Sequence, residues 1–261
     1  MLRQMFLKVF LCLNLTSLAL AREADQIVES TYGSIPRMRF SFHQPTYFVF
    51  GKDDLKMQFS AKYRLARSIP VYVAFTQLMF WDIYDNSRPF RDTNYGPEIF
   101  YRLIENLDQS LGTLDVGYLH NSNGKSELAS RSIHRLYIRA NYFTKISQQK
   151  LNLNFVTYKI LNQEKTNEDI VNHIGFWEVT ANLSELIYTQ FGSFALEVKA
   201  YAGAKVFDLD QGGNQIGLLF YPNSEKLNLA IYFQRFEGYS ESLIDYNKKR
   251  TVYRLGFNLP F

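Results

Sequence analysis

A histidine and a serine two residues apart, His120 and Ser122, are the first residues whose types and spacing could do chemistry. In an extended strand alternate side chains point to the same side. Both therefore share a face with the apolar residues Leu114 and Val116. A serine beside a histidine, with a third group that orients the histidine, is the arrangement of an activated nucleophile. Because this short spacing is common by chance, its interpretation depends on the surrounding elements.

The next segment places a second histidine in a matching position. His134 alternates with apolar residues such as Leu136, and the loop 123–131 joins its segment to the segment of Ser122. If the two segments pair as neighbouring strands, His120, Ser122 and His134 lie on one apolar face near one rim of the sheet. Their spacing permits an activated nucleophile, with a structural role of the histidines as the alternative.

Alternation with a period of two residues dominates the chain after residue 21, which predicts strands with one apolar and one polar face. Residues 55–65 are an example, with apolar side chains at the odd positions and mostly polar ones between them. No stretch is long and apolar enough for a spanning helix. Turn signals such as Asn123-Gly124 separate about twelve strand segments. These lie near 44–51, 55–66, 70–83, 97–105, 113–122, 132–143, 150–161, 174–186, 192–203, 214–221, 226–236 and 251–261.

The pattern favours an all-β, twelve-stranded antiparallel transmembrane β-barrel over a soluble sandwich or a lipocalin-like barrel. The segments are about ten residues long and aromatic residues, 16% of the chain, recur near their ends. An even number of strands closes the sheet without an unpaired edge in lipid. The last segment ends as the final strand of such barrels does, with an aromatic and apolar row at Tyr253, Leu255, Phe257, Leu259 and Phe261. On this barrel, His120, Ser122 and His134 face lipid, where polar groups are costly unless they serve a function.

The first 21 residues predict a signal peptide. Arg3 and Lys8 precede a short apolar run, and the small residue Ala21 suits cleavage before Arg22. A membrane anchor is the weaker alternative, because the run is short and interrupted by polar residues. Residues 22–261 would then be one barrel domain. The one cysteine, Cys12, lies in the leader, so the mature chain would form no disulfide.

The charge balance excludes one class of partner. The chain has 29 basic and 25 acidic residues, a net charge of +4, and two of the basic residues lie in the predicted leader. Nucleic-acid binding requires a concentrated basic face, so we expect no nucleic-acid partner. The high aromatic content also excludes a disordered chain.

Three sequence blocks resemble the outer-membrane phospholipase A family, in the order in which the family has them. They are P-F-R-D-T-N-Y at 89–95, H-N-S-N-G-K-S at 120–126 with S-R-S at 130–132, and G-Y-S-E-S-L-I-D-Y-N at 238–247. The similarity spans the mature chain and is weaker between the blocks. The resemblance implies a twelve-stranded barrel in the bacterial outer membrane that hydrolyses phospholipid acyl esters, with phospholipase A1, A2 and lysophospholipase activity. It also implies Ser122 as the nucleophile and His120 as the base.

The resemblance further implies calcium (Ca²⁺) as cofactor and a homodimer as the active form. The metal positions carried over are the main-chain carbonyl of Lys125, the hydroxyl of Ser130 and the carbonyl of Ser87 from the partner chain. Oxygen-only ligation suits this hard cation. Gln77 matches a glutamine that the family uses for contact between barrels.

Two positions depart from the family pattern. The family's third catalytic residue is an asparagine, where this chain has His134. A neutral imidazole in the right tautomer can replace the amide as an acceptor. Thr166 occupies the position of an acidic calcium ligand of the monomer, and Asp169 is nearby in sequence but is not assigned that role. Two alternative functions therefore remain: a catalytically inactive homologue and a passive outer-membrane pore.

Overall fold

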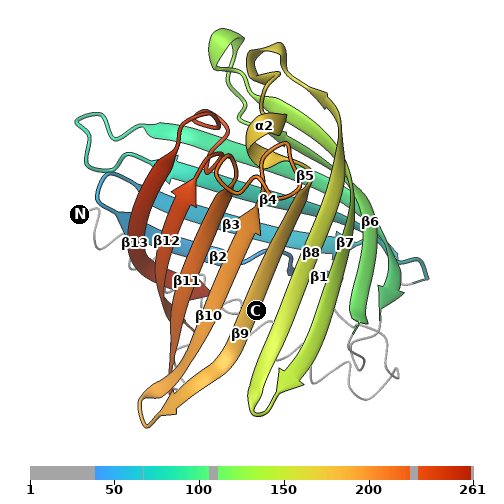
Figure 1. The fold of residues 1–261 in the computed structure, drawn as a ribbon, viewed down its shortest axis with the longest axis vertical. Coiled ribbons are helices and arrows are strands. Elements are labelled where there is room, and N and C mark those ends of the chain that lie inside the picture. Colours follow the sequence, from blue (N-terminus) through green and yellow to red (C-terminus); the bar gives the residue numbers. More distant parts are fainter. Residues whose placement is uncertain (1–38, 67, 106–110, 224–228, 260–261) are drawn as a thin grey trace. The chain divides into compact units, whose positions relative to one another are not determined.

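The computed structural model describes residues 39–66, 68–105, 111–223 and 229–259. Residues 40–261 form one compact unit (Figure 1). Its strands are β1 (Phe40–Phe42), β2 (Thr46–Gly51), β3 (Leu55–Arg64), β4 (Val71–Trp81), β5 (Phe90–Glu105), β6 (Leu111–Ser122), β7 (Ser132–Ile146), β8 (Gln149–Gln163), β9 (Trp177–Thr189), β10 (Gly192–Tyr201), β11 (Gly213–Pro222), β12 (Ala230–Gly238) and β13 (Arg250–Leu259). Short helical turns are η1 (Glu127–Ala129), η2 (Lys165–Asn167) and α2 (Val171–Ile174). No helix in these ranges is long and apolar enough to cross a membrane.

The sheet closes on itself as a twelve-stranded antiparallel barrel. From β2 to β13 each strand pairs with its neighbours in sequence, and β13 pairs with β2, for example Phe257 with Phe48. The short strand β1 does not add a thirteenth strand to the barrel. It pairs with β3 on the same side as β2, so β1 and β2 are two parts of one strand interrupted at residues 43–45. The fold class expected from the alternation is confirmed.

The distribution of side chains is the reverse of that in a soluble protein. Large apolar side chains such as Leu103, Ile138 and Leu255 are about half exposed on the outer surface. Charged and polar side chains such as Asp115 and Gln234 are buried inside. An outer apolar band around a polar interior is the signature of a transmembrane barrel. Tyr253, Leu255 and Phe257 share the outer face as predicted, whereas Phe261 lies outside the described residues, as do the predicted signal peptide 1–21 and its cleavage site after Ala21.

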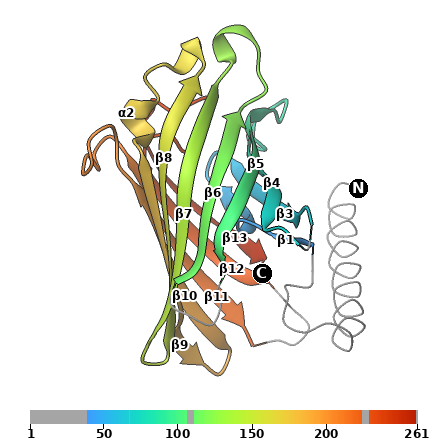
Figure 2. The same ribbon diagram turned by 90° about the vertical axis from the view of Figure 1, so that its right-hand side faces the viewer.

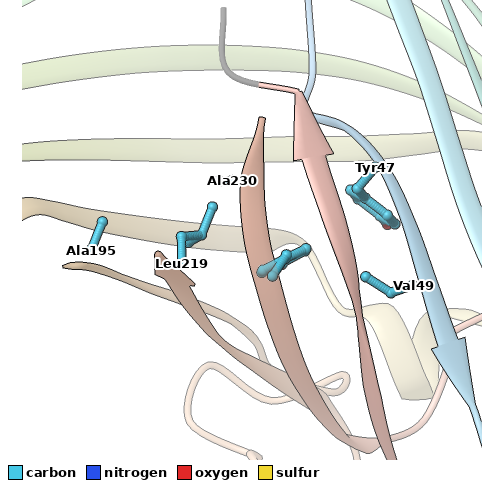
Figure 3. Close-up of a cluster of buried hydrophobic side chains, with 6 residues drawn as sticks. Tyr47, Val49, Ala195, Leu219 and Ala230 are labelled. Carbon is cyan, nitrogen blue, oxygen red and sulfur yellow. The ribbon is translucent and has the colours of Figure 1, made fainter. Parts of the chain in front are cut away.

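Side chains fill the barrel interior. Lys56 donates to Glu241, at 3.1 Å, and to Gln234, at 2.9 Å. The fully buried Arg254 forms ion pairs with Asp54 and Glu241. An apolar cluster occupies another part of the interior, with contributions from four strands (Figure 3). It consists of Tyr47, Val49, Ala195, Leu219, Ala230 and Tyr232.

The two ends of the barrel differ. At one end β7–β8 and β9–β10 are joined by the two-residue turns 147–148 and 190–191. At the other end lie the longer segments 82–89, 123–131, 164–176, 202–212 and 239–249, which we call the long-loop end (Figures 1 and 2). This asymmetry is typical of outer-membrane barrels. The chain reverses at Ser122, so His120 and Ser122 belong to the long-loop end.

One strand extends further than its sequence indicated. The segment expected to begin at Pro97 begins at Phe90, because the block 89–95 is itself extended. Proline usually begins a strand or lies at an edge. Pro97 instead lies within β5 on the outer face, where the pairing of β5 with β6 is interrupted between Tyr95 and Glu98.

The loop 239–249 is anchored by Asp245, which predicts an acid-sensitive stability. Burial by itself raises the pKa of this carboxyl, but the hydrogen bond from Lys248 and the charges of Arg250 and Arg91 lower it below its usual value. A depressed carboxyl pKa contributes stability above the ordinary value near 4, and this is lost as the pH falls through the folded value. We expect Asp245→Asn to lower the unfolding temperature in detergent at about pH 7 and to flatten its decline toward about pH 3.

The matched control for this experiment is Asp53→Asn, because Asp53 is exposed on the turn between β2 and β3. This control should keep the wild-type unfolding temperature and its pH dependence. An Asp245→Asn profile that coincides with that of Asp53→Asn would contradict the assigned anchoring.

Candidate active site

Strand β6 presents Tyr118, His120 and Ser122 on the outer face of the barrel. Along the strand the odd residues Thr113 and Asp115 are buried inside, and the three even residues are half-buried. The lipid-facing placement predicted for His120 and Ser122 is therefore what the structure has. Tyr118 lies on the same face, and the sequence analysis assigned it no role.

His134 lies directly beside His120 across the pairing of β6 with β7. The two residues are Cα partners, and their ring centroids are 4.4 Å apart with the planes tilted by 38°. The Nδ1 atom of His134 is hydrogen-bonded to the hydroxyl of Tyr118. The Nδ1 atom of His120 is buried and has no hydrogen-bond partner within the described part of the chain. The two imidazoles are thus in contact through their rings, with one nitrogen already engaged by tyrosine.

The other flank of β6 is shaped by Pro97. The register of Tyr95 with Ser122 and of Glu98 with Leu119 places Pro97 opposite His120. Proline has no N–H to contribute to a ladder, so the pairing is interrupted next to the histidine. On the far side of His134, the ladder between β7 and β8 shifts register, as at a β-bulge. Bulges near active sites change the direction in which side chains point.

On the interior side, the end of β6 is held by a side-chain hydrogen bond. Asn121, which points inward between His120 and Ser122, accepts a hydrogen bond from the guanidinium of Arg135. That guanidinium also lies 4.9 Å from the centroid of the Tyr158 ring. The site is therefore a polar outward pair backed by an inward cation–amide contact.

A single buried side chain, Asn123, organises the loop after Ser122. Its Nδ2 donates to the carbonyl of Ala129 at 2.9 Å. Its Oδ1 accepts from the backbone N–H of Arg131, at 2.9 Å, and of Lys125, at 3.3 Å. These bonds tie the two ends of 123–131 together. Sequence reasoning took Asn123-Gly124 as a turn signal and missed this role, although an Asx side chain bonding to nearby backbone is a known turn device.

The predicted metal positions divide between two loops. Lys125 and Ser130 both belong to 123–131, whereas Ser87 is exposed in 82–89, between β4 and β5. The hydroxyl of Ser130 makes no hydrogen bond to the rest of the described chain, while its carbonyl accepts from Thr166 and from Arg131. No group of three or more His, Cys, Asp or Glu side chains in the described ranges could hold a metal.

This donor set fits calcium only in part. Neutral oxygens suit a hard cation, but calcium takes about six to eight of them, and one chain supplies a carbonyl at Lys125 and a hydroxyl at Ser130. Asp169, the carboxylate near Thr166 in sequence, already accepts a hydrogen bond from Tyr246. The predicted positions on one chain therefore do not complete a calcium coordination shell.

The comparison with known proteins agrees with this geometry. A family model described as Phospholipase A1 matches residues 27–259. The chain belongs to the phospholipase A1 family. The phospholipases A1 of Salmonella typhimurium and of Escherichia coli K12 are each 30% identical to it over 223 residues, covering 80% of this chain and 70% of those proteins.

Solved structures support the same family. The crystal structure of the Salmonella typhi outer membrane phospholipase dimer with bound calcium has a TM-score of 0.71 at 25% identity and covers 88% of this chain and 94% of that one. The outer membrane phospholipase A of Escherichia coli has a TM-score of 0.70 at 25% identity, with 85% and 99% covered.

Two of the three blocks that resemble this phospholipase family contact each other. In the block 89–95, Asp92 accepts the backbone N–H of Ile244 at 2.9 Å, and Asn94 accepts that of Leu243 at 3.1 Å. The third block, 238–247, is therefore held on β5. In turn, Tyr246 of that block donates to Asp169.

The third block also reaches the loop 123–131 and the start of β7, partly through the segment 164–176. Tyr246 lies under the guanidinium of Arg131 at 5.7 Å. The fully buried Asn167 pairs with the backbone of Ser132, donating to its carbonyl at 3.0 Å and accepting its N–H at 3.2 Å. Because Ser132 is the cross-strand partner of Ser122, all three blocks support one rim of the barrel.

Proposed function

We propose that this protein hydrolyses acyl esters of phospholipids at the lipid-facing surface of the outer membrane, with Ser122 as nucleophile and His120 as base. One observation carries the proposal: His120 and Ser122 share the outer face at the long-loop end. Polar groups on a lipid face are expensive and mark function. Membership of the phospholipase A1 family supplies the reaction class.

In the proposed mechanism, the Ser122 oxygen attacks the ester carbonyl of a phospholipid acyl chain while His120 accepts its proton. His120 then gives that proton to the departing alcohol, which leaves as the lysophospholipid. Water, deprotonated by the same histidine, releases the fatty acid from the serine ester. Because the site faces the bilayer, we include either acyl position and lysophospholipids as substrates, hence A1, A2 and lysophospholipase activity.

We propose calcium as the cofactor, held at the loop 123–131 by the carbonyl of Lys125 and the hydroxyl of Ser130, with the carbonyl of Ser87 of the partner subunit. When bound there, the ion would polarise the ester carbonyl and stabilise the negative oxygen of the tetrahedral intermediate. Support comes from the unengaged Ser130 hydroxyl and from the related Salmonella typhi dimer with bound calcium. The shortage of oxygens within one chain makes a second subunit part of the same proposal.

The dimer contact is proposed to include Gln77. It lies on the outer face of β4, between Phe59 and Tyr95 on the neighbouring strands. The amide nitrogen bonds to the sulfur of Met79 at 3.4 Å, a weak acceptor. A second barrel would offer this lipid-facing amide a stronger partner. Export through the signal peptide 1–21, followed by a barrel domain 22–261, completes the proposed route to the outer membrane.

The two alternatives receive less support. A passive pore requires an open lumen, and buried ion pairs such as Arg254 with Asp54 and Glu241 occupy the interior. A pore would also give the outward His120 and Ser122 no role. An inactive homologue would explain His134 in place of asparagine, but the contact of His134 with His120 favours a working replacement.

The nucleophile can be tested with Ser122→Ala. Loss of the attacking oxygen should lower fatty-acid release from mixed micelles by several orders of magnitude, about 10⁴-fold or more. The matched control is Ser126→Ala in the adjoining loop 123–131, because the Ser126 side chain is exposed. The control should retain wild-type rates. Hydrolysis by Ser122→Ala at the control rate would refute the assignment.

The calcium site can be tested by removing its hydroxyl ligand. Ser130→Ala should raise the calcium concentration needed for half-maximal activity by about tenfold, the loss typical of a single donor contact. A chelator should abolish activity of the wild type, and cross-linking should report dimers whenever the enzyme is active. Full activity of a monomer in excess chelator would exclude both calcium and dimer from the mechanism.

His134 predicts a distinctive pH profile. A neutral imidazole offers one acceptor nitrogen, and a protonated one offers none and places a charge beside His120. The other side chains that face His134 are the phenol of Tyr118 on β6 and the amide of Asn162 on β8. We expect activity to fall in acid along a limb that reflects the coupled pair.

The comparison variant is His134→Asn, whose amide accepts at every pH. It should reduce the acid limb to a single titration and keep or raise activity at about pH 6. Superimposable rate profiles from about pH 5 to about pH 9 would mean that His134 does not orient the base.

A further inference from the structure

The hydroxyl of Tyr118 is engaged on the outer side of the barrel. It bonds to the Nδ1 atom of His134, and the two ring centroids are 6.0 Å apart. Tyr118 and His120 share one face of β6, so this contact continues the row that ends at Ser122.

The contact has consequences for the proton on His134. A neutral imidazole has one N–H donor and one acceptor nitrogen, and the bond made by one nitrogen sets the state of the other. If Nδ1–H donates to the tyrosine oxygen, Nε2 is left as an acceptor. If Nδ1 instead accepts, Nε2 carries the proton and cannot receive a bond from His120.

His120 requires the first of these arrangements. To act as a base it must carry its proton on one nitrogen and keep the other free for Ser122. Its Nδ1 is buried and has no partner within the described ranges, and the ring of His134 lies beside it at 4.4 Å between centroids. An acceptor on His134 would hold that Nδ1–H.

We propose that Tyr118 is a positioning residue that fixes the tautomer of His134, by accepting its Nδ1–H, so that His134 can orient His120. This inference rests on the proposed function of His120 and Ser122. It also explains how histidine can occupy the place of asparagine. An amide oxygen is always an acceptor, whereas imidazole needs a neighbour to keep its second nitrogen free.

The test is Tyr118→Phe, made alone and together with His134→Asn. Alone, it should lower kcat about tenfold with little change in KM, the scale of losing a group that orients a ligand or base. In the His134→Asn background it should change kcat less than about twofold, because the amide has no tautomer to fix. An equal loss in both backgrounds would indicate a purely structural effect and overturn the proposal.

A second measurement does not depend on turnover. Nitrogen-15 NMR of histidine-labelled protein in detergent micelles, at a pH where imidazole is neutral, should show His134 protonated at Nδ1 in the wild type. In Tyr118→Phe it should show a mixture of tautomers. A wild-type His134 protonated at Nε2, or a tautomer unchanged by Tyr118→Phe, would overturn the proposal.

The control is Tyr142→Phe, because Tyr142 is exposed on the same outer face of β7 as His134. It should leave both the tautomer and kcat unchanged. A tautomer that shifts in Tyr118→Phe without any loss of kcat would also overturn the positioning role. Failure of the proposed function itself appears separately, as hydrolysis retained by Ser122→Ala.

Discussion

Pairing of β13 with β2 is the interaction on which the rest of this structure depends. In a bilayer no water is present to satisfy the backbone N–H and C=O groups of an edge strand, so an open sheet is excluded. Closure between residues 46–51 and 254–259 gives both edge strands a partner. Once the sheet is closed, alternation assigns every side chain to lipid or to the interior. A polar residue on the outer side is then conspicuous.

Polar side chains have different surroundings inside and outside the barrel. Inside, the buried ions Lys56, Glu241, Arg254 and Asp54 are stabilised by pairing with opposite charges. Outside, His120, Ser122 and His134 lie beside the polar side chains of Tyr118, Ser132 and Asn162. The outward pair is positioned by rigid strands and by an inward contact of Asn121 with Arg135. A site on strands holds its geometry better than a site on loops.

The long-loop end shows why distant segments of the chain are needed for one site. Asp92 and Asn94 hold the backbone at 243–244, Tyr246 contacts Asp169 and Arg131, and Asn167 holds Ser132 beside Ser122. Each step is a hydrogen bond or a cation–ring contact between loops that would otherwise be free to move. These contacts link the loops of the rim to one another and to Ser132, the cross-strand partner of Ser122.

The sequence by itself determined the class of fold, the approximate strands and the outward direction of His120, Ser122 and His134. Period-two alternation is a local property that survives folding unchanged, so it can be read without knowing which strands pair. Boundaries were less secure where local rules conflict with pairing, as at Pro97, which lies within β5. The third block was recognised in the sequence, but its contacts were not.

Tertiary structure alone decided which groups meet across strands. The bond of Tyr118 to His134 and the pairing of Asn167 with Ser132 depend on register and on loop packing. Neither has a signal in residue spacing, because hydrogen bonds between strands and loops depend on three-dimensional distance. The sequence supplied the chemically capable residues, and closure of the barrel with packing of its loops fixed their partners.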